Sequence, residues 1–178
     1  PRAAGSLAGA ARVGIMTVTT DLVATWRRPR AILRQHFARG RSEPFALSFL
    51  LIFLVLAFVG QWPVAAREAF LAGEPSALPR ILARALAVLA TIPFWYGLAA
   101  LGHLAARAMG GQGTWYGARI ALFWALAAVG PLMLLQGLVS GMIGAGPALT
   151  LVSLLIGAAF LWLWATLLHE AEMGAGRI

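Results

Sequence analysis

The sequence predicts an all-α fold, a polytopic transmembrane helical bundle with an amphipathic interfacial segment ahead of its first span. Three observations carry this prediction. Hydrophobic residues make up 61% of the 178 residues and charged residues only 11%, whereas about a quarter of a typical soluble domain is charged. Four apolar stretches are long enough to cross a bilayer, which takes about 20 helical residues. Eight arginines precede the first of these stretches.

Each span is supported by its own local pattern. The first follows Ser42-Glu43-Pro44, a cap and first-turn pattern typical of a helix start. The second is interrupted by Thr91 and Pro93, and the third and fourth contain no Asp, Glu, Lys or Arg. Outer-membrane strands are excluded because polar and apolar residues do not alternate. The four predicted spans cover about 45–66, 81–104, 120–139 and 148–168 within a membrane domain of residues 45–178.

Two further regions precede the spans. Residues 1–15 are small and bland and lack the apolar core of a signal peptide, so we interpret them as an unstructured or mis-started leader. Residues 16–44 form a basic segment in which Ile32, Leu33 and Phe37 recur at helical spacing. We expect this stripe to enter the acyl region of a membrane surface, with a solvated basic tail as the alternative. The candidate ligands for anionic lipid headgroups are Arg27, Arg28, Arg30 and Arg34.

The distribution of arginine predicts the orientation of the chain. Eleven arginines fall on the side of the N-terminus and three on the other side, and an excess of arginine marks the cytoplasmic side. We therefore expect a multi-pass protein of the bacterial cytoplasmic (inner) membrane, with a cytoplasmic N-terminus. Nucleic acid is excluded as a partner because no water-facing domain carries the charge. The eleven are Arg2, Arg12, Arg27, Arg28, Arg30, Arg34, Arg39, Arg41, Arg107, Arg119 and Arg177; the three are Arg67, Arg80 and Arg84.

Polar residues that could carry chemistry are few. His103, His169, Glu170 and Glu172 fall near the cytoplasmic ends of the second and fourth spans. Histidine and carboxylate side chains can bind zinc, but the His-Glu-x-x-His spacing is missing. We expect His103 to lie at the headgroup boundary, bonded to a carbonyl or a partner side chain, with no metal and no cofactor. Cysteine is absent and no hydrolytic triad is visible, so we predict that the protein is not an enzyme.

Small residues and one proline have a predicted structural use. Gly110-Gly111-Gln112-Gly113 lacks the lysine of a phosphate-binding loop and predicts a tight turn, in which glycines accept positive φ. Pro131 is predicted to kink the third span. Two small-residue pairs, Gly137 with Gly141 and Ser153 with Gly157, predict close helix packing, within the bundle or between two copies.

The order of these features resembles that of bacterial members of the Yip family, membrane proteins named in eukaryotes for interaction with Ypt/Rab GTPases. The resemblance covers about residues 21–172 and implies a helical bundle without known enzymatic chemistry. Family members usually have five spans, so it also implies a fifth helix beyond Ile178. The eukaryotic Asp-Leu-Tyr-Gly-Pro signature is not present after Asp21-Leu22, so no GTPase partner is implied. The residues that carry the resemblance are Trp26-Arg-Arg-Pro-Arg30, His103, Gly110-Gly-Gln-Gly-Thr-Trp115, Ala118, Leu122 and Pro131.

Two hypotheses for function follow. The first is a non-enzymatic helical bundle that organises the membrane or recruits partners to it. Its partners would be the lipid bilayer with its anionic headgroups, other membrane proteins or a second copy of the chain. The alternative is a small transporter or transporter subunit, in which Tyr96 and His103, seven residues apart on one helix face, line a polar path.

Overall fold

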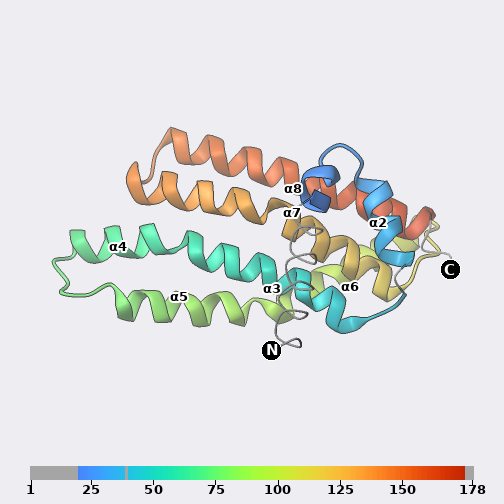
Figure 1. Cartoon of the computed structure of the whole chain (residues 1–178), viewed down its shortest axis with the longest axis horizontal. Helices are drawn as coiled ribbons and strands as arrows, with labels where there is room; N and C mark the ends of the chain where they lie inside the picture. The colour runs from blue at the N-terminus through green and yellow to red at the C-terminus, as the bar shows by residue number, and fades with distance from the viewer. Residues whose placement is uncertain (1–19, 39, 175–178) are drawn as a thin grey trace, which may run out of the picture.

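The computed structural model describes residues 20–38 and 40–174, and these residues form helices joined by short loops (Figure 1). They contain no β-strand, so the predicted all-α class is confirmed. A short helix over residues 20–25 comes first. The predicted leader, residues 1–15, lies outside the described residues. The helices that follow are α2 (Pro29–Ala38), α3 (Glu43–Gly60), α4 (Trp62–Leu71), α5 (Leu78–Ala90), α6 (Ile92–Ala108), α7 (Trp115–Met142) and α8 (Pro147–Met173).

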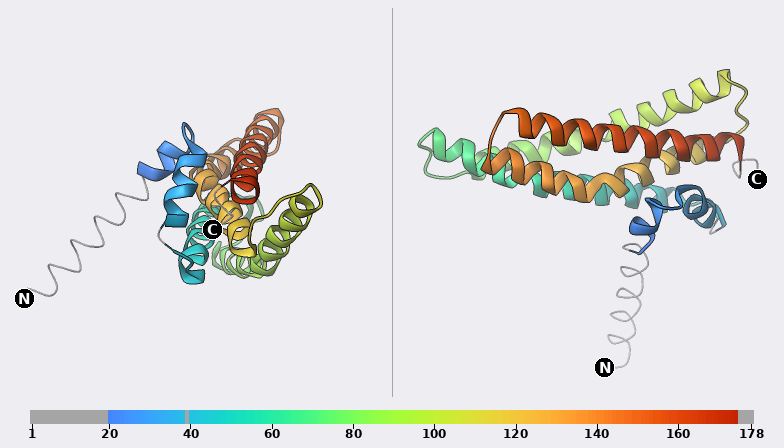
Figure 2. Two further views of the ribbon diagram at one scale, coloured as in Figure 1. Left: turned by 90° about the vertical axis from the view of Figure 1, so that its right-hand side faces the viewer. Right: turned by 90° about the horizontal axis from the view of Figure 1, so that it is seen from above.

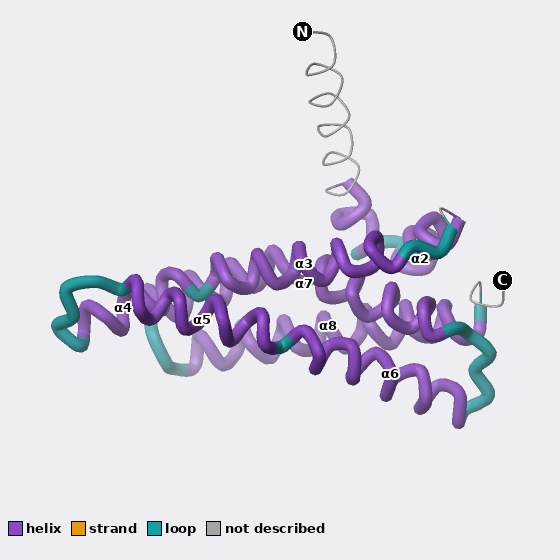
Figure 3. The backbone as a smooth tube through the Cα atoms, turned by 90° about the horizontal axis from the view of Figure 1, so that it is seen from below, coloured by secondary structure: helices purple, strands orange, loops and turns teal. Residues whose placement is uncertain are grey.

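Two pairs of these helices are almost continuous. Helix α3 gives way to α4 at Gln61, and α5 gives way to α6 at Thr91, with Pro63 and Pro93 in the first turn of each second helix. Proline has no backbone N–H, but this costs no hydrogen bond in the first turn of a helix, because the N–H groups of that turn have no partner within the helix. The break between α5 and α6 is visible as a short loop-coloured segment in an otherwise helical rod (Figure 3).

Four rods among the described residues are long and apolar enough to cross a membrane: Glu43–Leu71, Leu78–Ala108, Trp115–Met142 and Pro147–Met173. Successive rods alternate in direction, so that two ends of the bundle can be distinguished (Figure 1). The His103 end holds α2, the start of α3, the turn from α6 to α7 and the last turns of α8. The Arg80 end holds the loops from α4 to α5 and from α7 to α8.

Helix α7 is the centre of the bundle and packs against α3, α4, α6 and α8. Viewed from the His103 end, α7 lies in the middle while α2 lies against one side (Figure 2). Nearly every residue from Tyr116 to Gly130 of α7 is buried. Beyond Pro131, which lies inside the helix, most residues of α7 are partly or fully exposed. The thickest part of the protein is therefore near the His103 end, where α2 adds a further layer.

The N-terminal segment packs on protein, which corrects the expectation that its apolar stripe enters lipid. Leu33 is completely buried and Ile32 is 6% exposed, and α2 contacts α8. The hydroxyl of Thr25, itself completely buried, accepts a hydrogen bond of 2.9 Å from Trp124 Nε1 of α7. An apolar stripe indicates only that one face of a helix is shielded from water, by lipid or by protein. Here the neighbouring helices shield the apolar face of α2.

Candidate functional site

A buried polar cluster lies at the His103 end and joins three segments distant in sequence. His103 Nδ1 of α6 lies 2.6 Å from Glu172 Oε1 of α8, and the two side chains are 0% and 1% exposed. With Glu172 ionised, His103 Nδ1 carries the proton and donates to the carboxylate. The second carboxylate oxygen of Glu172 accepts from the N–H of Gly113 at 3.0 Å. One glutamate therefore ties α6, the turn before α7 and α8 together.

The glycine turn fits around this carboxylate. Gly110 adopts a φ of +92°, which favours glycine. A Cβ at Gly113 would lie 2.6 Å from the carbonyl oxygen of Ala171 and 2.8 Å from Oε2 of Glu172. At Gly111 it would lie 2.8 Å from the carbonyl oxygen of Ala106 and 3.0 Å from the same Oε2. The glycines are thus required partly for φ and partly for the close approach of Glu172.

His103 is more enclosed than the sequence suggested. We expected it to bond a carbonyl or a partner side chain, and it pairs with the side chain of Glu172 while its own side chain has no exposed surface. Its ring lies 4.4 Å from the ring of Trp115, centroid to centroid, and its Nε2 has no hydrogen-bond partner among the described residues. The described residues hold no group of three or more histidine, cysteine, aspartate or glutamate side chains that could bind a metal.

A second buried glutamate joins α8 to α2. Glu170 Oε1 accepts a hydrogen bond of 2.7 Å from Arg34 Nε, and the two side chains are 5% and 62% exposed. The hydrogen bond to Glu170 and the charge of that carboxylate raise the pKa of Arg34 above its usual value. Arg34, predicted as a headgroup ligand, therefore also anchors α2 to the bundle.

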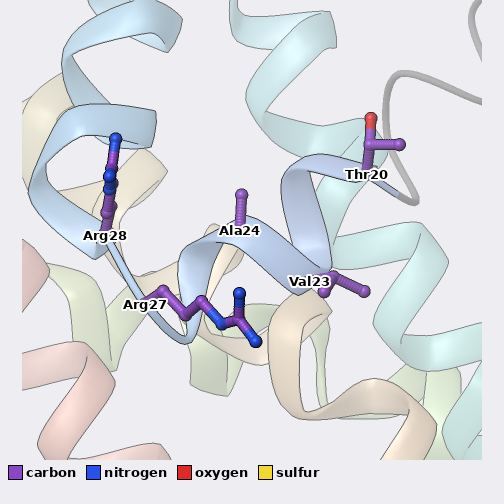
Figure 4. Close-up of a pocket in the computed structure, with 5 residues that line it drawn as sticks. All are labelled: Thr20, Val23, Ala24, Arg27 and Arg28. Atoms are coloured by element: carbon purple, nitrogen blue, oxygen red, sulfur yellow. The ribbon is translucent and has the colours of Figure 1, made fainter.

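The predicted headgroup arginines come together at one surface hollow. Arg27, Arg28, Arg30 and Arg34 all line a hollow of about 380 Å³. Arg27 and Arg28 also line a neighbouring hollow of about 620 Å³, together with Thr20, Val23 and Ala24 (Figure 4). Within the described residues, no ion pair is formed by Arg27, Arg28 or Arg30. Val23 is 69% exposed and Trp26 is 38% exposed beside them, so apolar and cationic groups share this surface.

The small-residue pairs behave differently from each other. A Cβ at Gly137 would collide with the carbonyl of Gly60, and one at Gly141 would collide with Pro63, so this pair lets α7 approach α3 and α4 inside one chain. Ser153 accepts a hydrogen bond of 2.9 Å from Gln136 Nε2 of α7. A Cβ at Gly157 would meet nothing within 4 Å among the described residues, so Gly157 packs against no described helix of this chain.

Tyr96 and His103, the pair proposed for a polar path, each contact an aromatic ring of helix α7. The ring of Tyr96 packs edge-on against Phe123 at 5.1 Å, while His103 is closed off by Glu172 and Trp115. A separate cavity of about 150 Å³ lies towards the Arg80 end, and its polar lining includes Gln61, Gln136 and Ser140. Sequence reasoning missed this cavity because Gln61 lies between α3 and α4, far in sequence from Gln136 and Ser140 of α7.

The Arg80 end carries an open network of ion pairs. Arg84 Nη2 lies 2.7 Å from Glu68 Oε1, and Arg80 bonds both Glu74 at 2.7 Å and Glu68 at 3.3 Å. Arg67 Nη1 donates to the carbonyls of Gly141 and Met142 at 3.2 and 3.0 Å. A cation at the C-terminal end of α7 also complements the helix dipole.

Residues 23–177 match the family model of the Yip1 domain. The chain belongs to the Yip1 domain family. The matched region runs from the N-terminal segment through α8, so the Yip1 domain includes both the docked helix α2 and the four apolar rods. The family and these rods support a multi-pass membrane protein. No curated protein and no solved structure matches the chain.

Proposed function

We propose that this Yip1 domain is a non-enzymatic protein of the bacterial cytoplasmic membrane that gathers anionic lipids around its His103 end. The observation that carries the proposal is the convergence of Arg27, Arg28, Arg30 and Arg34 on one hollow. Each arginine near a membrane surface contributes roughly 1 kcal/mol of attraction to anionic lipids. The exposed Val23 and Trp26 supply the apolar contact that accompanies such charge at an interface.

The absence of enzymatic activity is part of the proposal. In the buried pair of His103 and Glu172, the carboxylate is occupied by the imidazole and by the N–H of Gly113. Neither residue lines any of the hollows named above. A carboxylate held in this way supports structure better than it supports proton transfer to a substrate.

The lipid test uses the full chain, because α2 is docked on the bundle and an isolated peptide would lose that setting. The full chain in neutral detergent is titrated with phosphatidylglycerol or phosphatidylcholine, and bound lipid is counted by native mass spectrometry. Replacing Arg27, Arg28 and Arg30 with glutamine should weaken phosphatidylglycerol binding roughly a hundredfold at low salt. The matched lysine triple variant keeps the charge and should retain most of the binding. Equal binding by the glutamine triple variant would refute the proposal.

The proposed orientation can be tested because the chain contains no cysteine. Ser42 precedes α3 at the His103 end and Ser76 lies in the loop before α5 at the Arg80 end. With the His103 end in the cytoplasm, Ser76→Cys should react with a membrane-impermeant maleimide in intact bacterial spheroplasts. Ser42→Cys should react only after permeabilisation. The reverse pattern would show that the proposed orientation is wrong.

Transport is the second candidate function, and the cavity near Gln61, Gln136 and Ser140 favours it. Polar residues around a cavity between broken helices are a feature of many transporters. Purified protein in liposomes would be screened for proton and solute flux, with Gln136→Leu as the variant that removes the amide. Flux that is lost in this variant would support transport through the cavity, and absence of flux in the unchanged protein would exclude it for the solutes used. A Tyr96→Phe variant with full flux would count against the path at Tyr96 and His103.

A further inference from the structure

One of the four arginines in the hollow of about 380 Å³ is held differently from the other three. Arg34 Nε donates to Glu170 Oε1 at 2.7 Å, whereas Arg27, Arg28 and Arg30 form no ion pair within the described residues. Glu170 belongs to α8, is 5% exposed at its side chain, and does not line the hollow. A buried carboxylate therefore holds an arginine that itself lines the surface hollow.

The pairing with Glu170 uses only part of the guanidinium of Arg34. Its Nε bonds the carboxylate, and neither of its Nη atoms forms a hydrogen bond with the described residues. The side chain of Arg34 is 62% exposed, so the rest of the guanidinium is open to a ligand. The two Nη groups at the end of a guanidinium form a planar fork that matches two oxygens of a phosphate. Arg34 can therefore bind a phosphate without releasing Glu170.

The charge of Glu170 does not cancel the attraction of the hollow for an anion. Four arginines line the hollow, and the one glutamate paired with them leaves a formal charge of +3. The three arginines without an ion pair carry this excess charge. The hollow therefore still attracts an anionic headgroup while Glu170 stays bonded to Arg34.

The contribution of Glu170 to binding is the order that it imposes on Arg34. A long side chain loses rotamer freedom when it fixes a ligand, and this loss weakens binding. The bond to Glu170 restricts Arg34 before a ligand arrives, so less freedom remains to be lost. Arg27, Arg28 and Arg30 have no such ion pair, and we expect them to act mainly through their charge.

We propose that Arg34, oriented by Glu170, recognises the phosphate of the anionic lipid by its shape, through paired hydrogen bonds from its two Nη groups. Arg27, Arg28 and Arg30 attract the same headgroup by charge. Glu170 is a positioning residue, since it touches Arg34 and not the lipid. This inference rests on the lipid binding proposed above and names the residue pair that makes the site specific for a phosphate.

The first test separates shape from charge at Arg34. The full chain in neutral detergent is titrated with phosphatidylglycerol, and bound lipid is counted by native mass spectrometry. Arg34→Lys keeps the charge but removes the fork, so it should weaken binding about tenfold, as expected for the loss of one hydrogen bond between charged groups. Arg30→Lys makes the same exchange one turn earlier on α2, at an arginine without an ion pair, and should weaken binding far less. Equal losses in the two variants would refute recognition by shape.

The second test examines the positioning by Glu170. Glu170→Gln and Glu170→Ala both remove the charge, but only glutamine keeps a side-chain oxygen that can accept from Arg34 Nε. Glu170→Gln should therefore bind phosphatidylglycerol about fivefold more tightly than Glu170→Ala. When Arg34 is also replaced by glutamine, the two variants should bind alike, because no guanidinium remains to be oriented. A difference that persists in this background would show that Glu170 acts through the packing of α2 on α8, and would refute its positioning role.

The outcomes separate this inference from the proposed function. If the glutamine triple variant at Arg27, Arg28 and Arg30 loses the lipid while Arg34→Lys binds as the unchanged protein does, the proposed function holds and the inference is refuted. If the glutamine triple variant keeps the lipid, the proposed function itself is refuted. Displacement of the lipid by an equal concentration of glycerol 3-phosphate would show that the ligand is a dissolved phosphate and not a lipid.

Discussion

The two ends of the bundle hold their charged side chains in opposite ways. At the His103 end, the side chains of Glu172 and Glu170 are 1% and 5% exposed, and each binds a group from another element. At the Arg80 end, Glu68 and Glu74 are 41% and 37% exposed and bind arginines of the neighbouring α5. Buried carboxylates lose their water and must be paired, whereas exposed ones keep most of theirs.

Because of this difference, we expect the charged pairs at the two ends to contribute differently to the stability of the fold. Removing one member of a buried pair leaves its partner without a bond and without water, which costs far more than the pair contributes on balance. The exposed network is screened by water and salt and contributes little. The His103 end should therefore determine how α2, α6, α7 and α8 are held together, and the Arg80 end should tolerate substitution.

The largest expected effect is that of Glu172→Ala. His103 Nδ1 and the N–H of Gly113 would both lose their partner, at about 1–3 kcal/mol for a buried group and less for the part-buried N–H of Gly113. We expect the free energy of unfolding to fall by about 2–5 kcal/mol, measured by thermal unfolding of the full chain in detergent.

Glu170→Ala, two residues earlier on the same helix, is the matched control. It frees Arg34, whose side chain is 62% exposed and can be hydrated, so its effect should be much smaller. Equal losses for Glu170→Ala and Glu172→Ala would show that burial does not separate the two glutamates.

The next effect concerns the contact between α7 and α3. In Gly137→Ala, the new Cβ would collide with the carbonyl of Gly60, and overpacking of this kind costs about 1–3 kcal/mol. Gly157→Ala is the control, because a Cβ there meets nothing within 4 Å and alanine favours the helix by up to about 1 kcal/mol. The measurement is again thermal unfolding in detergent. Destabilisation by Gly157→Ala would indicate a contact of Gly157 outside the described chain, such as a second copy.

Part of this architecture could be predicted from the sequence. The family and the all-α membrane fold follow from long apolar stretches and the order of motifs. The close approach at Gly137 and Gly141 follows from helical spacing, because both residues fall on one face. The spacing of small residues does not specify which element lies opposite them, however. The pair of Ser153 and Gly157 therefore also predicted close packing, although no described residue lies within 4 Å of a Cβ at Gly157.

The pairings at the His103 end could not be predicted from the sequence. His103 and Glu172 are 69 residues apart, and although both were expected near one membrane face, nothing local specified their contact. Thr25 carried no signal, because its hydroxyl matters only once α7 brings Trp124 beside it.

A moderate effect is expected at the contact between the N-terminal segment and α7. Thr25→Val keeps the shape but leaves Trp124 Nε1, which now donates to the Thr25 hydroxyl at 2.9 Å, without an acceptor. We expect a loss of about 1–2 kcal/mol and faster tryptic cleavage after Arg27. Thr150→Val, at an exposed hydroxyl that bonds the carbonyl of Gly146, should change neither. Unchanged cleavage in Thr25→Val would show that this hydrogen bond does not hold the segment on the bundle.

The smallest effect is expected at the Arg80 end and depends on pH. The hydrogen bond from Arg80, together with its charge, lowers the pKa of Glu74, in the loop between the first two rods, below its ordinary value of about 4.5. A lowered pKa in the folded protein means that the ion pair stabilises the fold above the ordinary pKa. That contribution disappears as the pH falls through the lowered value. Glu74→Gln should therefore unfold at a slightly lower temperature than the unchanged protein near neutral pH, and this difference should shrink as the pH is lowered below the ordinary pKa. The difference at neutral pH should shrink in about 1 M salt, because the carboxylate and the guanidinium are both open to solvent.

A difference at neutral pH as large as that of Glu172→Ala would remove the contrast between the two ends, since an exposed pair would then stabilise the fold as strongly as a buried one.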